Sequence, residues 1–236
     1  MSLCPNFLYA GPDIPWMNPE CIGINTLPPR THLHGFTNEV EAINAKPLDS
    51  HWHLNLDGNW KFRLYQKPAD LDEGCIKPDG KDSEWDSIKV PGNWMMQGYD
   101  SPHYTNVQMP FAHQPPKVPE ENPTGVYRSC FTLPKDWKER RTVIHFGGVE
   151  SAFFVFFNGN KVGFSKDSRT PVEFNLTPWI VSGTNHLTVV VIRWSDGSFL
   201  EDQDHWWMAG PHRSIYLRST AMTDLCLLYT SDAADD

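Results

Sequence analysis

A short apolar run that ends in Asn158-Gly159 constrains the fold more than any other segment of this chain. Residues 151–157 (SAFFVFF) are apolar at almost every position, which is the pattern of a central strand covered on both faces. Asn-Gly tolerates positive φ at both positions, as the type I′ turn of a two-residue hairpin requires. A second strand is therefore expected to return over residues 161–164.

Further short strands are indicated along the rest of the chain. Trp60, Phe62 and Leu64 alternate with polar neighbours, the period of a half-buried strand. Because 20 Pro and 16 Gly interrupt 236 residues, long helices are not expected. The expected strands cover residues 54–65, 125–133, 141–146, 151–157, 161–164, 171–176, 186–194 and 213–218, with one more short strand before residue 90. The pattern predicts an all-β fold, an antiparallel jelly-roll sandwich.

Three regions are expected along the chain. Residues 1–50 are rich in Pro, His and Asn and predict an extended N-terminal arm, whereas residues 51–220 form the predicted jelly-roll domain. Within it, residues 90–118 have no regular period, and ordered loops of that length are usually functional. Residues 221–236 begin as a linker.

Charge and cysteine content exclude several classes of protein. A net charge of −9 without a Lys/Arg stripe argues against a nucleic-acid partner. The five cysteines lack CxxC spacing, which argues against a disulfide framework and a zinc site. They are Cys4, Cys21, Cys75, Cys130 and Cys226. With no secretory leader and no membrane-length apolar run, the expected location is the cytoplasm, without a membrane partner.

Four segments carry a family resemblance. They are residues 90–110 (VPGNWMMQGYDSPHYTNVQMP), 118–128 (VPEENPTGVYR), 157–176 (FNGNKVGFSKDSRTPVEFNL) and 193–213 (RWSDGSFLEDQDHWWMAGPHR). In order and spacing they resemble the β-galactosidase branch of the family-2 glycoside hydrolases. The resemblance implies a sugar-binding jelly roll that precedes an immunoglobulin-like domain and a catalytic barrel. It implies hydrolysis of β-galactosides such as lactose with retention, in a homo-oligomer that the arm helps to hold together.

Two residues match positions with a role in that family. Asn106 matches an asparagine that reaches toward the galactose, and Asp204 matches an aspartate that contacts sugar hydroxyls and helps to ligate sodium. The resemblance thus implies two substrate-binding residues, Asn106 and Asp204, with Asp204 also a metal ligand. A carboxylate suits hydroxyl donors and a hard cation. The remaining sodium ligands and the magnesium site are implied to lie in the barrel, so no ordered ion is expected in this fragment.

Each of these residues also has a simpler interpretation. Asn in a Pro-flanked loop is commonly a turn residue, and an acidic run such as 201–204 is commonly a solvated loop. Of Trp206 and Trp207, one is expected to fill the core. The pairs His51/His53 and His32/His34 have the spacing of a strand-borne metal pair, but no third ligand accompanies them.

No catalytic residue is expected in this chain. Retaining glycosidases use two carboxyl groups about 5–5.5 Å apart across the scissile bond. Glu201, Asp202 and Asp204 share one loop and would not face each other across a cleft. Two alternatives stay open: a stand-alone carbohydrate-binding module, or a fragment of a sibling β-glucuronidase or β-mannosidase.

The last residues depart from the family pattern. Residues 226–236 (CLLYTSDAADD) match the translation of a transposase-type sequencing adapter, although a biological tail is the alternative. The adapter interpretation predicts a truncated gene whose natural sequence continues differently after Leu225.

Overall fold

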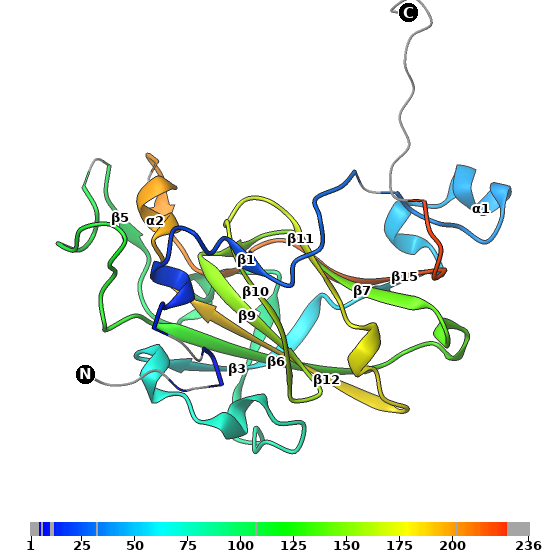
Figure 1. The fold of residues 1–236 in the computed structure, drawn as a ribbon, viewed down its shortest axis with the longest axis horizontal. Helices are drawn as coiled ribbons and strands as arrows, with labels where there is room; N and C mark the ends of the chain where they lie inside the picture. The colour runs from blue at the N-terminus through cyan, green and yellow to red at the C-terminus, as the bar shows by residue number, and fades with distance from the viewer. Residues whose placement is uncertain are drawn as a thin grey trace, which may run out of the picture.

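Two antiparallel sheets packed against each other form most of the described chain (Figure 1). The structure is a computed structural model that describes residues 5, 7–9, 12–31, 33–106, 108–201 and 203–225. The expected all-β fold, an antiparallel sandwich of the jelly-roll class, is confirmed.

The larger sheet contains, in spatial order, β1 (Gly23–Ile24), β10 (Asn160–Lys166), β9 (Ala152–Phe157), β12 (Thr184–Ile192), β6 (Thr124–Thr132), β3 (Gly58–Tyr65) and β4 (Asp86–Val90). The smaller sheet contains β11 (Val172–Asn175), β7 (Arg141–Phe146), β15 (Ile215–Thr220) and β2 (His53–Asn55). Two ribbons pair β5 (His103–Tyr104) with β13 (Trp206–Trp207), and β8 (Val149–Glu150) with β14 (Gly210–Pro211).

Helices are short, as the Pro and Gly content predicts. The α-helices are α1 (Glu39–Asn44) and α2 (Gly197–Leu200). The 3-10 helices are η1 (Pro15–Met17), η2 (Pro47–Asp49), η3 (Pro68–Asp70), η4 (Glu73–Ile76), η5 (Trp94–Gln97), η6 (Lys135–Trp137) and η7 (Thr177–Trp179).

Strand β9 is buried on both faces, as its sequence predicts. All six of its residues are buried. Phe153, Val155 and Phe157 enter the core between the two sheets. Phe154 and Phe156 point the other way, into a second core on the outer face of the larger sheet. Each buried Phe side chain contributes about 2–3 kcal/mol, so this strand anchors both layers.

The hairpin after β9 confirms the prediction from Asn158-Gly159. Both residues have positive φ, 50° and 78°, and β10 returns antiparallel with Asn160 opposite Phe157. The Asn158 side chain donates to the Trp179 carbonyl at 2.8 Å and accepts from the His186 N–H at 2.8 Å. The turn therefore also ties neighbouring loops to the end of β12.

The single strand expected over residues 54–65 is wrong, because the chain changes sheets within it. Strand β2 pairs with β15 in the smaller sheet, whereas β3 pairs with β4 and β6 in the larger one. Between them, the Asp57 carboxylate accepts from the Ile215 N–H at 2.9 Å, and Gly58 has φ 145°. The alternation of apolar and polar residues continues through this bend, so the sequence pattern does not reveal that the chain changes sheets there.

The N-terminal segment lies along the outer face of the larger sheet, seen in blue in Figure 1. Trp16 is buried with its ring 6.1 Å from that of Phe154. Gly23 and Ile24 pair with Ser165 and Phe164 and form the edge strand. Residues 226–236 lie outside the described residues, so the adapter interpretation remains a prediction.

Candidate functional site

A two-stranded ribbon of β5 and β13 brings the segment that contains Asn106 close to the segment that contains Asp204. In it Tyr104 lies opposite Trp206, and His103 lies opposite Trp207. The Trp207 indole N–H donates to the Thr105 hydroxyl at 2.7 Å. Asn106 and Asp204, 98 residues apart in the sequence, are thus each placed two residues from the same cross-strand pair.

Asp204 is exposed and held by one hydrogen bond. Its Oδ1 accepts from the Tyr104 hydroxyl at 2.5 Å. This bond raises the pKa of the Tyr104 phenol. Oδ2 makes no hydrogen bond among the described residues, so this oxygen remains available to an external donor.

Asn106 is also exposed and lies in a bend beyond β5. The structure records no hydrogen bond from its side chain to any described residue, and none to Asp204. The ribbon therefore places both expected substrate-binding residues at one end of the molecule without joining them to each other.

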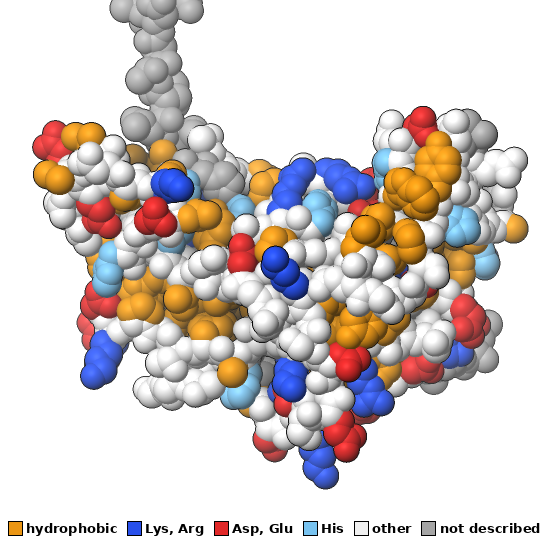
Figure 2. All heavy atoms as spheres, turned by 180° about the vertical axis from the view of Figure 1, so that it is seen from behind, with side chains coloured by type: hydrophobic (Ala, Val, Ile, Leu, Met, Phe, Trp, Pro, Cys, Tyr) orange, Lys and Arg blue, Asp and Glu red, His pale blue; other side chains and the backbone are white. Residues whose placement is uncertain are grey.

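The two tryptophans take different roles, as the sequence predicts. Trp207 is 2% exposed and packs against Trp194, with ring centroids 5.4 Å apart. Trp206 is 54% exposed, and its ring lies 5.5 Å from that of Tyr104. The resulting aromatic surface belongs to the lobe of β5 and α2, on the right in Figure 2, where hydrophobic side chains gather.

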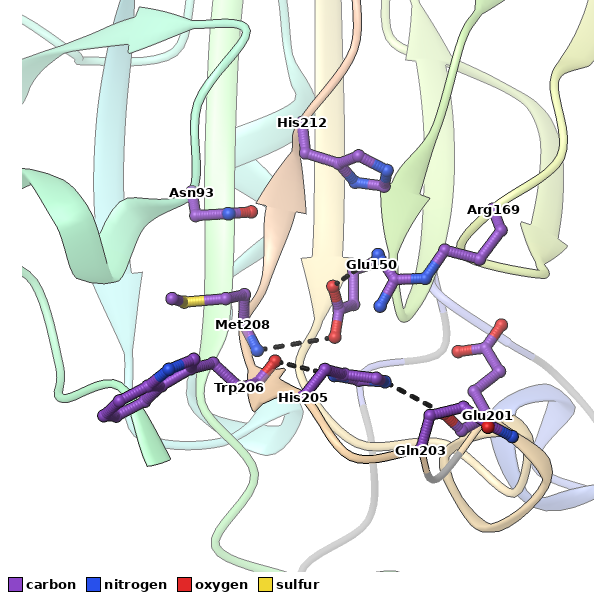
Figure 3. A pocket seen from close by; sticks show the side chains of 9 residues that line it. All are labelled: Asn93, Glu150, Arg169, Glu201, Gln203, His205, Trp206, Met208 and His212. Atoms are coloured by element: carbon purple, nitrogen blue, oxygen red, sulfur yellow. Dashed lines mark hydrogen bonds and ion pairs between the residues drawn. The ribbon is translucent and has the colours of Figure 1, made fainter. Parts of the chain in front are cut away.

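A hollow of about 430 Å³ opens beside this lobe (Figure 3). Trp206 and Gln203, which flank the Asp204 loop, line it. Asn93, Glu150 and Arg169 point into it from three separate segments: the turn before η5, strand β8 and the turn after β10. Neither Asn106 nor Asp204 lines this hollow.

Glu150 is the residue of the hollow that sequence reasoning missed. It is 5% exposed. One carboxylate oxygen pairs with Arg169 at 3.3 Å, and the other accepts from the Met208 N–H at 3.4 Å. Burial raises its pKa to about 7, and Arg169 only partly opposes this. The sequence feature that could have indicated Glu150 is its position as a single carboxylate directly before the apolar run 151–157.

The loop around Asp204 is fastened at both of its ends. The Glu201 carboxylate accepts from Ser168, from its N–H at 2.7 Å and its hydroxyl at 2.5 Å. The His205 ring contacts the carbonyl oxygens of Trp206 at 2.9 Å and Glu201 at 3.1 Å. Glu201 and Asp204 are therefore anchored to different segments.

Residues 54–221 match the sequence model of a known protein family. That model is described as "Glycosyl hydrolases family 2, sugar binding domain". The chain belongs to this family. The matched range contains the ribbon, the hollow and both expected substrate-binding residues.

The most similar relatives of this family-2 domain include proteins named beta-galactosidase. The one from Psychromonas ingrahamii is 47% identical over 210 residues, which cover 89% of this chain and 20% of the relative. The one from Vibrio cholerae is 48% identical over 203 residues, 86% of this chain and 19% of the relative. The chain thus spans about one fifth of the length of these relatives.

Solved structures similar to the family-2 domain bear other names. A beta-glycosidase from Bacteroides vulgatus matches with TM-score 0.54 and 26% identity, covering 71% of this chain and 20% of that one. A Bacteroides uniformis beta-glucuronidase matches with TM-score 0.55 and 22% identity, covering 72% and 18%. The second likeness shows the fold alone.

The histidine pairs do not form a shared site in the family-2 domain. His51 pairs with Asp136, whereas His53 Nε2 lies 3.2 Å from His34 Nδ1. Burial, followed by the nearby His34 and Arg218, lowers the pKa of His53 to about 4. His32 lies outside the described residues. Within the described ranges, no three His, Cys, Asp or Glu side chains are grouped to hold a metal ion.

Cysteines and helices give two further observations. Cys21, Cys75 and Cys130 are free thiols, and burial raises the pKa of Cys75 to about 12. Cys4 and Cys226 lie outside the described residues.

In the part of the chain that the structure describes, neither helix is long and apolar enough to cross a membrane.

Proposed function

We propose that this domain supplies the substrate-binding edge of a β-galactosidase, whose longer chain hydrolyses terminal non-reducing β-D-galactose residues with retention. The observation that carries the proposal is the 42–48% identity to eight relatives named beta-galactosidase. It extends through both the Asn106 and the Asp204 loops. Lactose is the proposed natural type of substrate, and a homo-oligomer is the proposed assembly.

Asn106 and Asp204 are the proposed contacts to the galactoside. Both are exposed on the ribbon end of the domain. An amide both donates and accepts hydrogen bonds, and a carboxylate accepts from hydroxyls. The free Oδ2 of Asp204 and the unbonded Asn106 amide are therefore chemically matched to sugar hydroxyls.

Asp204 is also the proposed ligand of a sodium ion. An exposed carboxylate oxygen fits a hard cation that prefers oxygen ligands. Among the described residues, no group of three His, Cys, Asp or Glu side chains surrounds Asp204, so the other ligands are proposed to come from other parts of the longer protein. The magnesium of the proposed enzyme is assigned to residues outside this domain.

The chemical step is likewise assigned outside this domain. A retaining mechanism needs two carboxyl groups about 5–5.5 Å apart. In the described loop, Glu201 is bound to Ser168 and Asp204 to Tyr104. Each carboxylate bonds to a different segment, and the two share one loop instead of facing each other across a cleft.

The cytoplasm is the proposed location. The thiols of Cys21, Cys75 and Cys130 are free, and reduced thiols are the rule in that compartment.

Hydrolysis assays test the enzyme class. The purified chain should release nothing from a chromogenic β-galactoside, whereas the protein encoded by the uninterrupted genomic reading frame should hydrolyse it and leave the β-glucuronide intact. Asn106→Ala and Asp204→Asn in that longer protein should raise KM, with Gln66→Ala as the control. Turnover by the chain alone, or preference for the glucuronide, contradicts the proposal.

A stand-alone carbohydrate-binding module is the second candidate, favoured by the description of the matching family as a sugar binding domain. Calorimetry with galactose and lactose separates the two. A module should bind with submillimolar Kd, whereas an edge that supplies two contacts should bind more weakly.

A further inference from the structure

One histidine from each of the two sequence pairs lies where the N-terminal segment meets the smaller sheet. His34 belongs to that segment, and His53 is the first residue of β2. His34 Nδ1 lies 3.2 Å from His53 Nε2, and the ring centroids are 5.0 Å apart. Two separate segments therefore bring imidazole nitrogens to the same place.

The spacing of these two nitrogens suits a shared metal ion. Zinc–imidazole bonds are about 2.0–2.1 Å long, so an ion bound by both nitrogens at their observed separation would make an angle of about 100–105° with them, close to tetrahedral. A straight hydrogen bond between the rings would hold the centroids about 5.5 Å apart. Bonds to one ion would hold them about 5.0 Å apart, which agrees with the structure.

Both imidazoles are accessible to an ion from solvent. Each residue is only partly buried, so an ion reaches the pair without opening the sandwich. The neutral form of imidazole is the form that binds metals, and it predominates above about pH 6.5.

The charges on this face of the smaller sheet are balanced. Arg218, which lies opposite His53 between β15 and β2, pairs with Asp224 at 3.3 Å. Arg30 of the N-terminal segment pairs with Glu173 at 3.1 Å. Because each of these guanidinium groups has a carboxylate beside it, they present little net positive charge to a divalent ion.

The ligand type selects the kind of ion. Imidazole nitrogen suits Zn²⁺, Ni²⁺ and Cu²⁺, whereas Mg²⁺ and Ca²⁺ prefer oxygen ligands. Among the described residues, no set of three His, Cys, Asp or Glu side chains is grouped to hold an ion, so water would complete the coordination of an ion at this pair. The pair thus differs in chemistry from the proposed sodium ligand Asp204.

We propose that His34 and His53 form a two-imidazole site for a divalent transition-metal ion. The bound ion joins the N-terminal segment to β2, in addition to the Arg30–Glu173 pair that joins it to β11. The site is independent of galactoside binding and of hydrolysis by the longer protein.

Titration of the chain with nickel chloride at pH 7.5 tests the site, with protein that carries no histidine tag. Calorimetry should show saturable binding, and nickel at ten times its Kd should raise the melting temperature by about 3–6 °C. His34→Gln and His53→Gln should each weaken binding at least tenfold, because each removes one of two ligands. His113→Gln, at an exposed histidine elsewhere, is the matched control, and magnesium chloride should have no effect.

A measurement on the unaltered chain guards against misfolding of the variants. Ni²⁺ is paramagnetic, so a substoichiometric amount should broaden the nuclear magnetic resonance signals of the His34 and His53 rings. The Tyr216 ring, whose centroid lies 5.4 Å from that of His53, should broaden with them. The His113 signals should broaden only at higher nickel concentrations.

Three results overturn the proposal. Binding that survives His53→Gln would place the ion on the N-terminal segment alone. An equal loss from His113→Gln would show that nickel binds exposed histidines without preference. Absence of saturable binding would show that the pair is an ordinary hydrogen bond between two rings. None of these results bears on galactoside hydrolysis by the longer protein, so the two proposals fail separately.

Discussion

The carboxyl group of Glu150 is protonated more readily in the folded domain than in the unfolded chain. Its pKa is about 7 when folded, against 4.5 for an ordinary glutamate. The folded state therefore binds the extra proton between these values. Stability is highest below pH 4.5 as far as this group is concerned, falls as pH rises toward 7, and levels off above it.

Replacing Glu150 with Gln should remove this dependence. At pH 8 the Glu150→Gln variant should be more stable than the parent by about 2–3 kcal/mol, because burial no longer opposes a charge. At pH 4.5 the two should be equal. Urea unfolding at both pH values measures the difference, with the exposed Glu84→Gln as the control. An equal gain at both pH values would contradict the assigned pKa.

At the scale of elements, Glu173 on β11 joins the N-terminal segment to the smaller sheet. Its carboxylate accepts from Arg30 at 3.1 and 3.3 Å and contacts His145 at 3.3 Å. Burial would raise its pKa, but these hydrogen bonds outweigh burial and lower the pKa to about 2. Arg218, on β15, lies 3.9 Å away. One carboxylate thus contacts side chains from three segments.

Removing this charge should weaken the domain strongly. Glu173→Gln leaves the largely buried Arg30 guanidinium without its carboxylate partner and leaves Arg218 with Asp224 alone, and we expect a loss of about 3 kcal/mol near pH 7. Since the native pKa is depressed, the parent's advantage exists above pH 4.5 and disappears as pH falls toward 2. Denaturant unfolding at pH 7 and pH 3 measures both effects. A loss that does not diminish in acid would point to packing rather than charge.

Two substitutions at Asn158 in the β9–β10 turn distinguish the cost of its backbone conformation from the contribution of its side-chain hydrogen bonds. Asn158→Gly keeps the positive φ but removes the hydrogen bonds to Trp179 and His186, so it should cost about 1–2 kcal/mol. Asn158→Ala should cost about 1 kcal/mol more, because φ 50° is unfavourable for alanine. Thermal unfolding of both variants measures the order. Equal losses would mean that the backbone conformation contributes nothing.

The sequence allows the strands to be predicted but not the contacts between distant segments. The apolar alternation at Trp60 and Phe62 reflects local backbone geometry, and so does the Asn158-Gly159 turn. Both can be predicted from the sequence alone. The bend at Asp57 depends on Ile215, and the burial of Glu150 depends on Arg169 and β14. Such features arise only after the sheets assemble. The positions of Asn106 and Asp204 were assigned by family resemblance, and the Asn93–Glu150 hollow had no local pattern.

At the scale of the whole molecule, the exposed aromatic lobe is an unusual surface for a monomeric domain. Leu200, Trp206 and Tyr104 are 85%, 54% and 48% exposed, and exposed apolar patches commonly mark interaction sites. Relatives are about five times longer than this chain. The lobe is therefore expected to face the remainder of the longer protein.

Oxidative footprinting tests this arrangement. Trp206 should be modified readily in the isolated chain and protected in the longer protein, because the added polypeptide would cover the lobe. Buried Trp207 is the internal control and should stay protected in both. Equal modification of Trp206 in both proteins would show that the lobe remains open to solvent.

The pairing of the N-terminal segment with late strands has a consequence for synthesis on the ribosome. Arg30 and Glu173 are 143 residues apart, and Gly23 pairs with Ser165. The N-terminal segment of this domain must therefore wait, unpaired, until most of the domain has emerged. Because contacts of such long sequence separation form late, the nascent chain carries an unprotected Trp16 while most of this domain is synthesised. Chaperone capture during elongation should accordingly concentrate on this first segment and end once β11 is available.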